Sequence, residues 1–375
     1  MKKFLIIFFA IVLAVAVALM IKVSQFYNRI QTSAQSTSTK KVAPEDKKTY
    51  NILLMGYGGA NHDGTYLTDT MMVMHMDMKA KRVLLVSIPR DIWVKVPTKS
   101  GEDFHAKINS VYQMALFNKN YPDLDVKGDD DQAAAEFAKQ AVTTVTGMPI
   151  DNYIAIDFTG FKKSVDILGG VDVQVEKTFD DYEYPIDGKE KDLCGKQESD
   201  LPELEKIATQ DAVLAFPCRY EHLHFDAGQK HMDGETALKY VRSRHSLQDG
   251  TDFGRAARQQ RFLEAMKDKV ISFGFLPKVI PLMDELKDYI KMDISLADMQ
   301  KFLGEAGKSK EYKISSLVIS NSNYLKNSYS TAGGFILVPQ DGIDEWGDVR
   351  TRIHNDMLGI TPTPTKVASP SGKLR

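Results

Sequence analysis

The most hydrophobic part of the chain lies at its start. The run Phe4–Ile21 holds 18 apolar residues without a charge, with Lys2 and Lys3 before it and Lys22 after it. This length approaches what a helix needs to cross the core of a bilayer. A cleaved signal peptide is the alternative, but its apolar core is usually shorter and ends at a small-residue site, which this sequence lacks. We therefore expect an uncleaved transmembrane anchor within residues 1–22, and the leading lysines favour a cytoplasmic N-terminus.

Two polar segments bound one folded region. Residues 23–48 are rich in Ser, Thr, Lys and Gln, a composition typical of a linker, and residues 360–375 combine Pro with Ser and Thr, as in a disordered tail. No comparable linker interrupts the chain between them. Residues 49–359 are therefore predicted to form one extracytoplasmic domain, with 178–227 as an irregular, polar insertion or lid.

Apolar runs and amphipathic stretches alternate within this domain. The pattern predicts strands at 51–55, 70–76, 82–88, 92–96, 153–156 and 171–175, and helices at 132–146, 158–168, 233–241 and 255–271. Acids precede the helix at 132 and Gly147 follows it, as helix ends prefer. Alternating strands and helices predict a layered α/β domain.

The overall charge excludes one class of function. Lys plus Arg is 48 and Asp plus Glu is 50, which gives a net charge of −2. Broad nucleic-acid binding needs a basic face, so we expect no nucleic-acid partner. Any anion site must come from local clustering of arginine.

The two cysteines, Cys194 and Cys218, both fall in the polar segment 178–227. Outside the cytoplasm a pair so close in sequence is expected to be bonded, with two free thiols as the alternative. Such a bond would stabilise the insertion by about 3 kcal/mol and would carry no chemistry.

Arg90 and Asp91 follow the apolar run 83–88 after Pro89. Side chains at strand ends in open α/β sheets point into the crevice where ligands bind. An arginine there suits a phosphate, because its planar group donates two hydrogen bonds to two oxygens. The alternative is a surface arginine paired with Asp91.

A second arginine cluster lies at the junction of two predicted helices. Arg242 and Arg244 leave the C-terminal end of the helix at 233–241, where a simple helix-end charge is the alternative explanation. In the helix at 255–271, Arg255 and Gln259 fall on the apolar face, Arg258 on its flank and Arg261 nearly opposite. A buried arginine needs a partner, so Arg255 and Gln259 should face a carboxylate, such as Asp252, or a ligand. Arg261 should be a solvated charge.

Two acids near these arginines are candidate metal ligands. Asp69 stands at the start of a predicted strand, and Asp63 lies in a Gly-rich loop. Mg²⁺ usually binds one or two carboxylates plus substrate phosphates. The alternative for Asp69 is a turn cap, a role that Asp adopts readily.

Seven segments in order, behind the hydrophobic N-terminus, resemble the LytR-CpsA-Psr family of cell-wall assembly proteins. They are Asn51–Gly56, Leu67–Thr70, Ser87–Asp91, Lys107–Asn109, Val165–Val173, Asp233–Arg244 and Asp252–Gln259. They span about residues 49–270, and the match is looser from there to residue 359.

The resemblance implies a three-layer α-β-α sandwich around a central mixed sheet, held outside the cell membrane by a single-pass anchor. It implies a phosphotransferase that moves a glycopolymer from a polyprenyl-pyrophosphate carrier to peptidoglycan as a phosphodiester, with Mg²⁺. Membrane lipid, the carrier-linked polymer and peptidoglycan would be its partners. The implied pyrophosphate contacts are Arg90, Arg242, Arg244, Arg255 and Gln259, and the implied catalytic residues are Arg90, Asp69 and Asp252.

One position departs from the family pattern. Many members carry an acid two residues after the glycine that matches Gly56, and here that position is Gly58. Asp63 could replace the missing acid as a metal ligand beside Asp69. The departure keeps a non-catalytic polyprenyl-phosphate-binding or regulatory protein open as an alternative, and a pyrophosphate hydrolase with water as acceptor is another.

Overall fold

The computed structural model describes residues 24–25, 28–29, 47–59, 64–248, 250, 252–271, 285–306 and 308–360. The expected anchor, most of the linker, Asp63 and nearly all of the expected tail lie outside these residues. Within the described part of the chain, no helix combines the length and apolar character needed to span a membrane.

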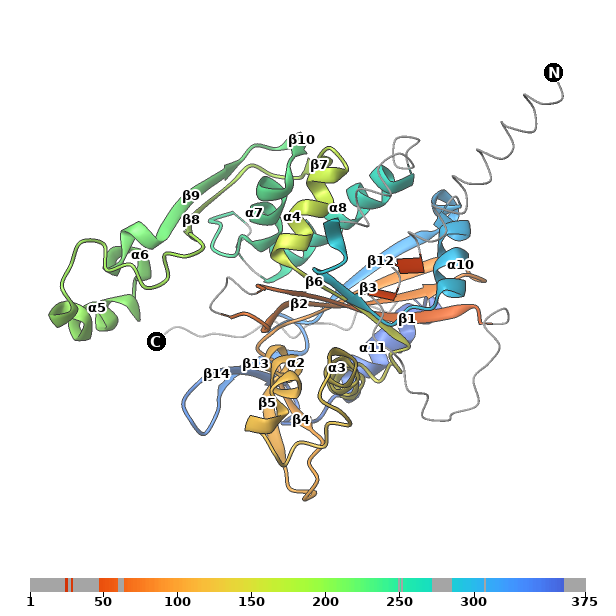
Figure 1. Ribbon diagram of the computed structural model, residues 1–375, viewed down its shortest axis with the longest axis horizontal. Helices are drawn as coiled ribbons and strands as arrows, with labels where there is room; N and C mark the ends of the chain where they lie inside the picture. Colours follow the sequence, from red (N-terminus) through yellow and green to blue (C-terminus); the bar gives the residue numbers. More distant parts are fainter. Residues whose placement is uncertain are drawn as a thin grey trace, which may run out of the picture.

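A mixed six-stranded sheet forms the centre of the molecule, in the order β11-β6-β1-β2-β3-β12 (Figure 1). Its strands are β1 (Thr49–Tyr57), β2 (Thr68–Asp77), β3 (Arg82–Ile88), β6 (Asn152–Asp157), β11 (Ile290–Met292) and β12 (Lys313–Val318). β2 runs antiparallel to β1 and β3, whereas β1 is parallel to β6 and β3 is parallel to β12.

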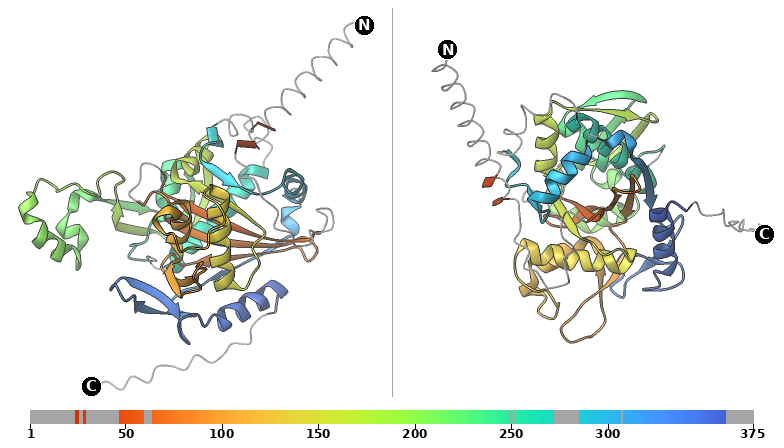
Figure 2. Two further views of the ribbon diagram at one scale, coloured as in Figure 1. Left: turned by 60° about the horizontal axis from the view of Figure 1, so that its bottom comes forward. Right: turned by 90° about the vertical axis from the view of Figure 1, so that its right-hand side faces the viewer.

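Helices cover both faces of this sheet (Figures 1 and 2). One face carries α2 (Ile108–Leu116), α3 (Asp131–Thr146) and α11 (Gly347–Leu358), and the other carries α4 (Phe158–Ile167), α7 (Gly234–Arg242), α8 (Asp252–Ile271) and α10 (Leu296–Ala306). The described chain therefore forms the expected α-β-α sandwich. Two hairpins follow strands of the main body: β4 (Trp93–Val96) pairs with β5 (Phe104–Lys107), and β13 (Leu325–Tyr329) pairs with β14 (Phe335–Pro339).

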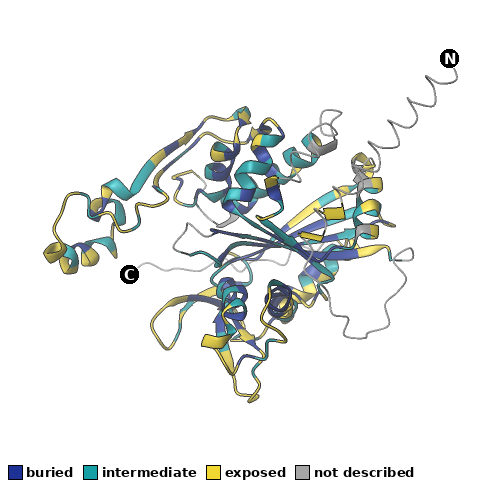
Figure 3. Ribbon diagram, viewed as in Figure 1, coloured by how far each residue is buried: buried dark blue, intermediate teal, exposed yellow. Residues whose placement is uncertain are grey.

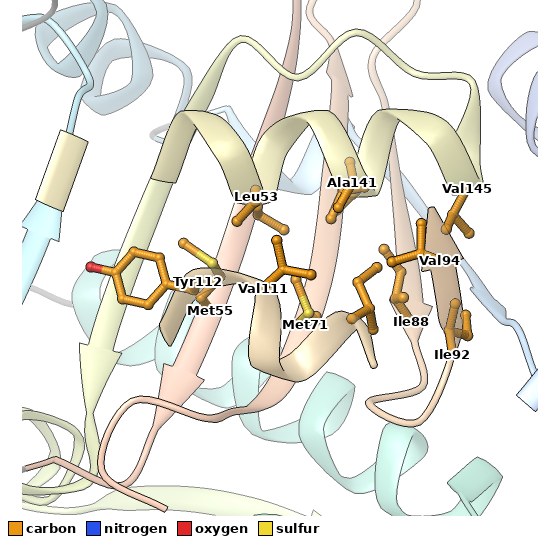
Figure 4. Packing of buried hydrophobic residues seen from close by; sticks show 14 of the residues in the cluster. Leu53, Met55, Met71, Ile88, Ile92, Val94, Val111, Tyr112, Ala141 and Val145 are labelled. Atoms are coloured by element: carbon orange, nitrogen blue, oxygen red, sulfur yellow. The ribbon is translucent and has the colours of Figure 1, made fainter. Parts of the chain in front are cut away.

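The main core lies between the sheet and α2, α3 and α11. Leu53 and Met55 of β1 point toward Val111 of α2 and Ala141 of α3 (Figure 4). Their neighbours in β1 point to the other face, because successive side chains of a strand alternate. The alanines of α3 are all buried, so their small side chains allow this helix to approach the sheet closely.

One predicted strand pairs outside the central sheet. β7 (Val171–Val175) has the predicted bounds, but it pairs with β10 (Gly228–Met232) in a separate two-stranded sheet. This small sheet shares a second core with α4, α7 and α8. Gly234 begins α7 against α4, where an added Cβ would lie 2.3 Å from Lys162 O, so only glycine fits there.

The expectation that residues 178–227 are irregular is wrong. β8 (Phe179–Pro185) and β9 (Tyr220–Phe225) form a hairpin that projects from the body, with α5 (Leu201–Ala208) and α6 (Ala212–Ala215) at its largely exposed tip (Figures 1 and 3). The sequence did not predict β8, because its buried face carries the acidic Asp181 beside Phe179 and so lacks the apolar pattern of a strand. At the tip Cys194 and Cys218 form a disulfide with Cα atoms 5.5 Å apart.

Candidate functional site

A polar pocket of about 300 Å³ lies where β2 begins and β3 has just ended. Three parts of the fold supply its walls: the ends of these strands, the α7–α8 junction and the β8–β9 insertion. It brings together all five residues expected to contact pyrophosphate, with Asp69 beside them: Arg90, Arg242, Arg244, Arg255 and Gln259. These residues come from four separate stretches of the sequence, so the sheet and the two helices create the cluster.

Arg90 makes its short contact with Asp69 rather than with its neighbour Asp91. Arg90 Nη1 lies 2.9 Å from Asp69 Oδ1, whereas its Nε lies 3.5 Å from Asp91 Oδ2. Asp91 is held instead by Lys107, whose Nζ donates to it at 2.8 Å. Burial alone would lower the pKa of Arg90, but the carboxylates of Asp69 and Asp91 outweigh it and raise the pKa above its ordinary value. A permanent positive charge therefore faces the pocket.

Arg242 is more than a charge at a helix end. Asp233 caps the start of α7 by accepting a hydrogen bond from Thr236 N at 2.8 Å. At the other end, the Arg242 guanidinium lies 4.2 Å from the centre of the Phe158 ring and donates to Tyr184 Oη at 3.2 Å.

The insertion supplies an acid to the same arginine. Asp187 accepts hydrogen bonds from Arg242 Nη1 at 3.2 and 3.3 Å. Burial raises the pKa of Tyr184, so its hydroxyl stays neutral beside the arginine. The segment 178–227 therefore forms one wall of the pocket.

The face of α8 that holds Arg255 and Gln259 is turned toward the pocket, as its helical spacing predicted. Gln259 Nε2 donates to Thr70 Oγ1 at 3.2 Å and to Val241 O at 3.3 Å, which ties α8 to β2 and α7. Arg261 lies outside the pocket wall and pairs with Glu176 near the surface.

The position of Arg258 differs from the prediction. The periodicity put it on the flank of the apolar face, but the side chain is only 1% exposed. Its Nε donates to Tyr240 O at 3.1 Å, its Nη2 donates to Ser243 O, and its guanidinium lies 4.8 Å from the centre of the Phe179 ring. The apolar residues of α8 could not reveal this, because the groups that bury Arg258 belong to β8 and to the end of α7.

An apolar cavity of about 280 Å³ adjoins the polar pocket. It lies between one face of the sheet and helices α4 and α8, and Phe262, Leu263 and Met266 form its α8 side. The two spaces share Thr70, Phe158, Val241, Arg242 and Gln259. A second apolar cavity of about 310 Å³ shares Leu54 and Leu263 with the first and continues toward α10. The shared residues place the two apolar cavities next to each other, on the side away from the arginines.

The described residues do not build a complete metal cage. Among them, the one group of three potential ligands with atoms within 4.8 Å of one another is Asp192 with Cys194 and Cys218, and these cysteines are bonded to each other. Asp69 is the acid of the polar pocket that lies beside Arg90. Near Gly58, the side chain of Asp157 lies against Gly59, but its Oδ1 accepts from Gly160 N at 2.7 Å as the cap of α4. Asp63 and the side chain of Asp252 lie outside the described residues, so their predicted roles stay predictions.

The sequence pattern did not reveal several pocket residues that belong to the insertion, among them Asp181, Glu183, Tyr184 and Asp187. The one local signal was the i, i+2 spacing of Phe179 and Asp181, which puts both on one face of a strand.

Comparisons with known proteins agree with this architecture. The model of the LytR_cpsA_psr family matches residues 14–337. The chain is 27% identical over 304 residues to the Bacillus subtilis protein named polyisoprenyl-teichoic acid–peptidoglycan teichoic acid transferase TagV, covering 79% of this chain and 63% of that protein. It is 24% identical over 312 residues to the Enterococcus faecalis protein named polyisoprenyl-teichoic acid–peptidoglycan teichoic acid transferase TagU, covering 80% of this chain and 82% of that protein.

Among solved structures, protein gbs0355 from Streptococcus agalactiae shares the fold with a TM-score of 0.57 at 20% identity, over 88% of this chain and 94% of that one. The family match spans the central sheet, both arginine clusters and the insertion. This chain therefore belongs to the LytR-CpsA-Psr family.

Proposed function

We propose that this protein is a phosphotransferase that moves a glycopolymer from a polyprenyl-pyrophosphate carrier to peptidoglycan, forming a phosphodiester. The observation that carries the proposal is the junction of two unlike spaces. A pocket lined by four arginines opens onto an apolar cavity between the sheet and α8. A ligand that fits both must join a multiply charged anion to a long apolar chain, and a lipid pyrophosphate has this composition. The names of the TagV and TagU relatives support a polyisoprenyl-linked donor and a peptidoglycan acceptor.

The arginines suit the chemistry of pyrophosphate cleavage. When an acceptor hydroxyl attacks the phosphorus next to the glycopolymer, its oxygen gives up its proton, the bond to the bridging oxygen breaks, and negative charge grows on the departing lipid phosphate. Fixed positive charges aimed at that point lower the barrier, because they are already oriented before the reaction. Arg90, Arg242, Arg244 and Arg255 surround the pocket and would bind the two phosphates.

Asp69 gives Arg90 its orientation through the 2.9 Å ion pair. Its carboxylate is about one-third exposed to the pocket, so it would also hold Mg²⁺ together with the substrate phosphates. A bound Mg²⁺ would supply further positive charge to the phosphate oxygens. One carboxylate fits this mode of binding, because Mg²⁺ often completes its coordination with phosphate oxygens and water.

Incubation of the full-length protein with a lipid-pyrophosphate-linked glycan, with and without a peptidoglycan acceptor, tests the proposal. Acceptor-linked product that forms only in the presence of the acceptor would support transfer. Release of phosphorylated glycan into water would indicate a hydrolase, and binding without turnover would indicate a carrier-binding or regulatory protein.

The binding or regulatory alternative has one observation in its favour. Gly58 stands where many family members have an acid, and Asp157, the acid against Gly59, is engaged as a helix cap. A site without an acid at this position can keep its arginines, and hence its affinity for the carrier, without turnover.

We propose in addition that the protein is anchored in the cell membrane by Phe4–Ile21, with its domain outside the cytoplasm. The uncharged run supports this location. The full-length chain should remain in the membrane fraction after a high-salt wash, and its release by salt would contradict the anchor.

A further inference from the structure

Arg242 and Arg244 are two residues apart and yet line the same pocket. In an α-helix, side chains at i and i+2 point in directions about 200° apart, which would send one arginine away from the site. In extended backbone, side chains at i and i+2 lie on the same side. The change occurs at Ser243, which ends α7 with φ −48° and ψ 133°. Both arginines can face the pocket because the helix ends at this residue.

A buried carboxylate from the insertion binds this turn. Asp181 of β8 is fully buried, and its Oδ2 accepts hydrogen bonds from Ser243 Oγ at 2.6 Å, Arg244 N at 3.1 Å and His245 N at 3.2 Å. Its Oδ1 accepts from Glu183 N at 2.9 Å. These bonds can form only when the chain after Arg242 has left the helix and runs along β8.

A buried cation from α8 binds the same turn. Arg258 is 1% exposed, and it donates to Ser243 O and Tyr240 O near the end of α7. The last turn of an α-helix has carbonyl groups that its own N–H groups do not reach, and Arg258 donates to oxygens at this end of α7. Ser243 itself is fully buried, with its hydroxyl donating to Asp181 and its carbonyl oxygen accepting from Arg258.

We propose that Asp181, Ser243 and Arg258 are positioning residues that fix the Arg242–Arg244 pair in the geometry that binds the phosphates. This inference rests on the proposed function, because it assigns a role within that anion pocket. A helix can end with a glycine alone, whereas burying two charged groups costs free energy unless each is fully hydrogen-bonded. The buried side chains of Asp181 and Arg258 fix the backbone after Arg242, and thereby the direction of both arginines. A helix that ended with a glycine would leave that direction free to vary. The insertion thereby orients residues of the site as well as forming one of its walls.

The test compares pyrophosphate affinity with thermal stability. Ser243→Ala removes one hydroxyl, and Asp181→Asn removes one charge. Asp293→Asn is the control, because Asp293 is a buried carboxylate that accepts from Lys139 and from Tyr153 N and does not line the pocket. Titration calorimetry of the full-length proteins in detergent with inorganic pyrophosphate gives the Kd, and a melting curve gives the Tm. We expect Ser243→Ala and Asp181→Asn to bind pyrophosphate about tenfold more weakly, the scale of one lost hydrogen bond to a charged group. Asp293→Asn should lower the Tm and leave the Kd unchanged.

Hydrogen exchange supplies a second readout. In Asp181→Asn the amides of Arg244 and His245 should exchange faster than in the wild type. If Asp181→Asn fails to fold, Ser243→Ala carries the test, because it removes a single oxygen atom. Wild-type pyrophosphate affinity in Ser243→Ala would overturn the inference. Absence of pyrophosphate binding by the wild type would overturn the proposed function, and this inference with it.

Discussion

Arg255 and Arg261 lie on the same helix, α8, but have different surroundings, so they allow a matched comparison. Arg255 lines the polar pocket, whereas Arg261 pairs with Glu176 outside it. Both lie in the same helix, so replacement by alanine changes helix propensity equally. Only Arg255→Ala should affect the binding of an anion.

The expected magnitudes differ enough to separate the two. A hydrogen bond from arginine to a charged phosphate contributes about 1.5–3 kcal/mol, so Arg255→Ala should weaken pyrophosphate binding by about 10- to 150-fold. The pair of Arg261 with Glu176 is partly exposed and screened by solvent, so its loss should cost about 0–1 kcal/mol of folding stability and no affinity.

Titration calorimetry with inorganic pyrophosphate, with a melting curve for each variant, measures both quantities. A loss of affinity for Arg255→Ala with a near wild-type Tm supports the assigned face of α8. Equal affinities for the two variants would refute the reasoning, because the pocket would then not depend on the side of the helix that faces it.

Three further predictions follow from the same geometry. Asp69→Ala should fold normally and lose transfer by about 10²-fold or more; a chelator should reproduce this loss in the wild type, added Mg²⁺ should restore only the wild type, and full activity of the variant in chelator would contradict the metal role. Leu263→Trp fills the junction of the two apolar cavities, so it should raise the KM for a long-tailed lipid donor and spare a short-tailed one; equal KM changes for both donors would count against a lipid path there. Cys194→Ser opens a loop with a sequence separation of 24, so it should destabilise the insertion by about 3 kcal/mol and speed its cleavage in limited proteolysis; unchanged proteolysis would show that the disulfide does not stabilise it.

Local features of the fold were predictable from the sequence. The bounds of β3 and β7 match their apolar runs, and α3 begins after Asp130 and ends at Gly147 as its end signals indicated. The pairing of β7 with β10 was not predictable, because the partner lies more than fifty residues away and carries little apolar pattern of its own.

For the candidate site, too, local sequence patterns were predictive and long-range contacts were not. Arg90 and Arg255 were found from a strand end and from a helical face, both of which are local patterns. The burial of Asp181 and of Arg258 was not predicted, since each is buried by contacts with segments remote in sequence. A charged residue gives no sequence signal of burial when its partners come from elsewhere in the fold.

In the proposed reaction, the arginine pocket beside the apolar cavity binds a lipid carrier from which a phosphate-linked glycan is transferred. The most direct measurement is the amount of acceptor-linked product formed by the wild type and by Arg90→Ala, from a lipid-pyrophosphate-linked glycan with a peptidoglycan acceptor. The wild type should form this product, and Arg90→Ala should fold, as its melting curve will report, yet form about 10²-fold less of it. Product formation by Arg90→Ala at the wild-type rate would contradict the account, because the pyrophosphate could not then be bound in this pocket.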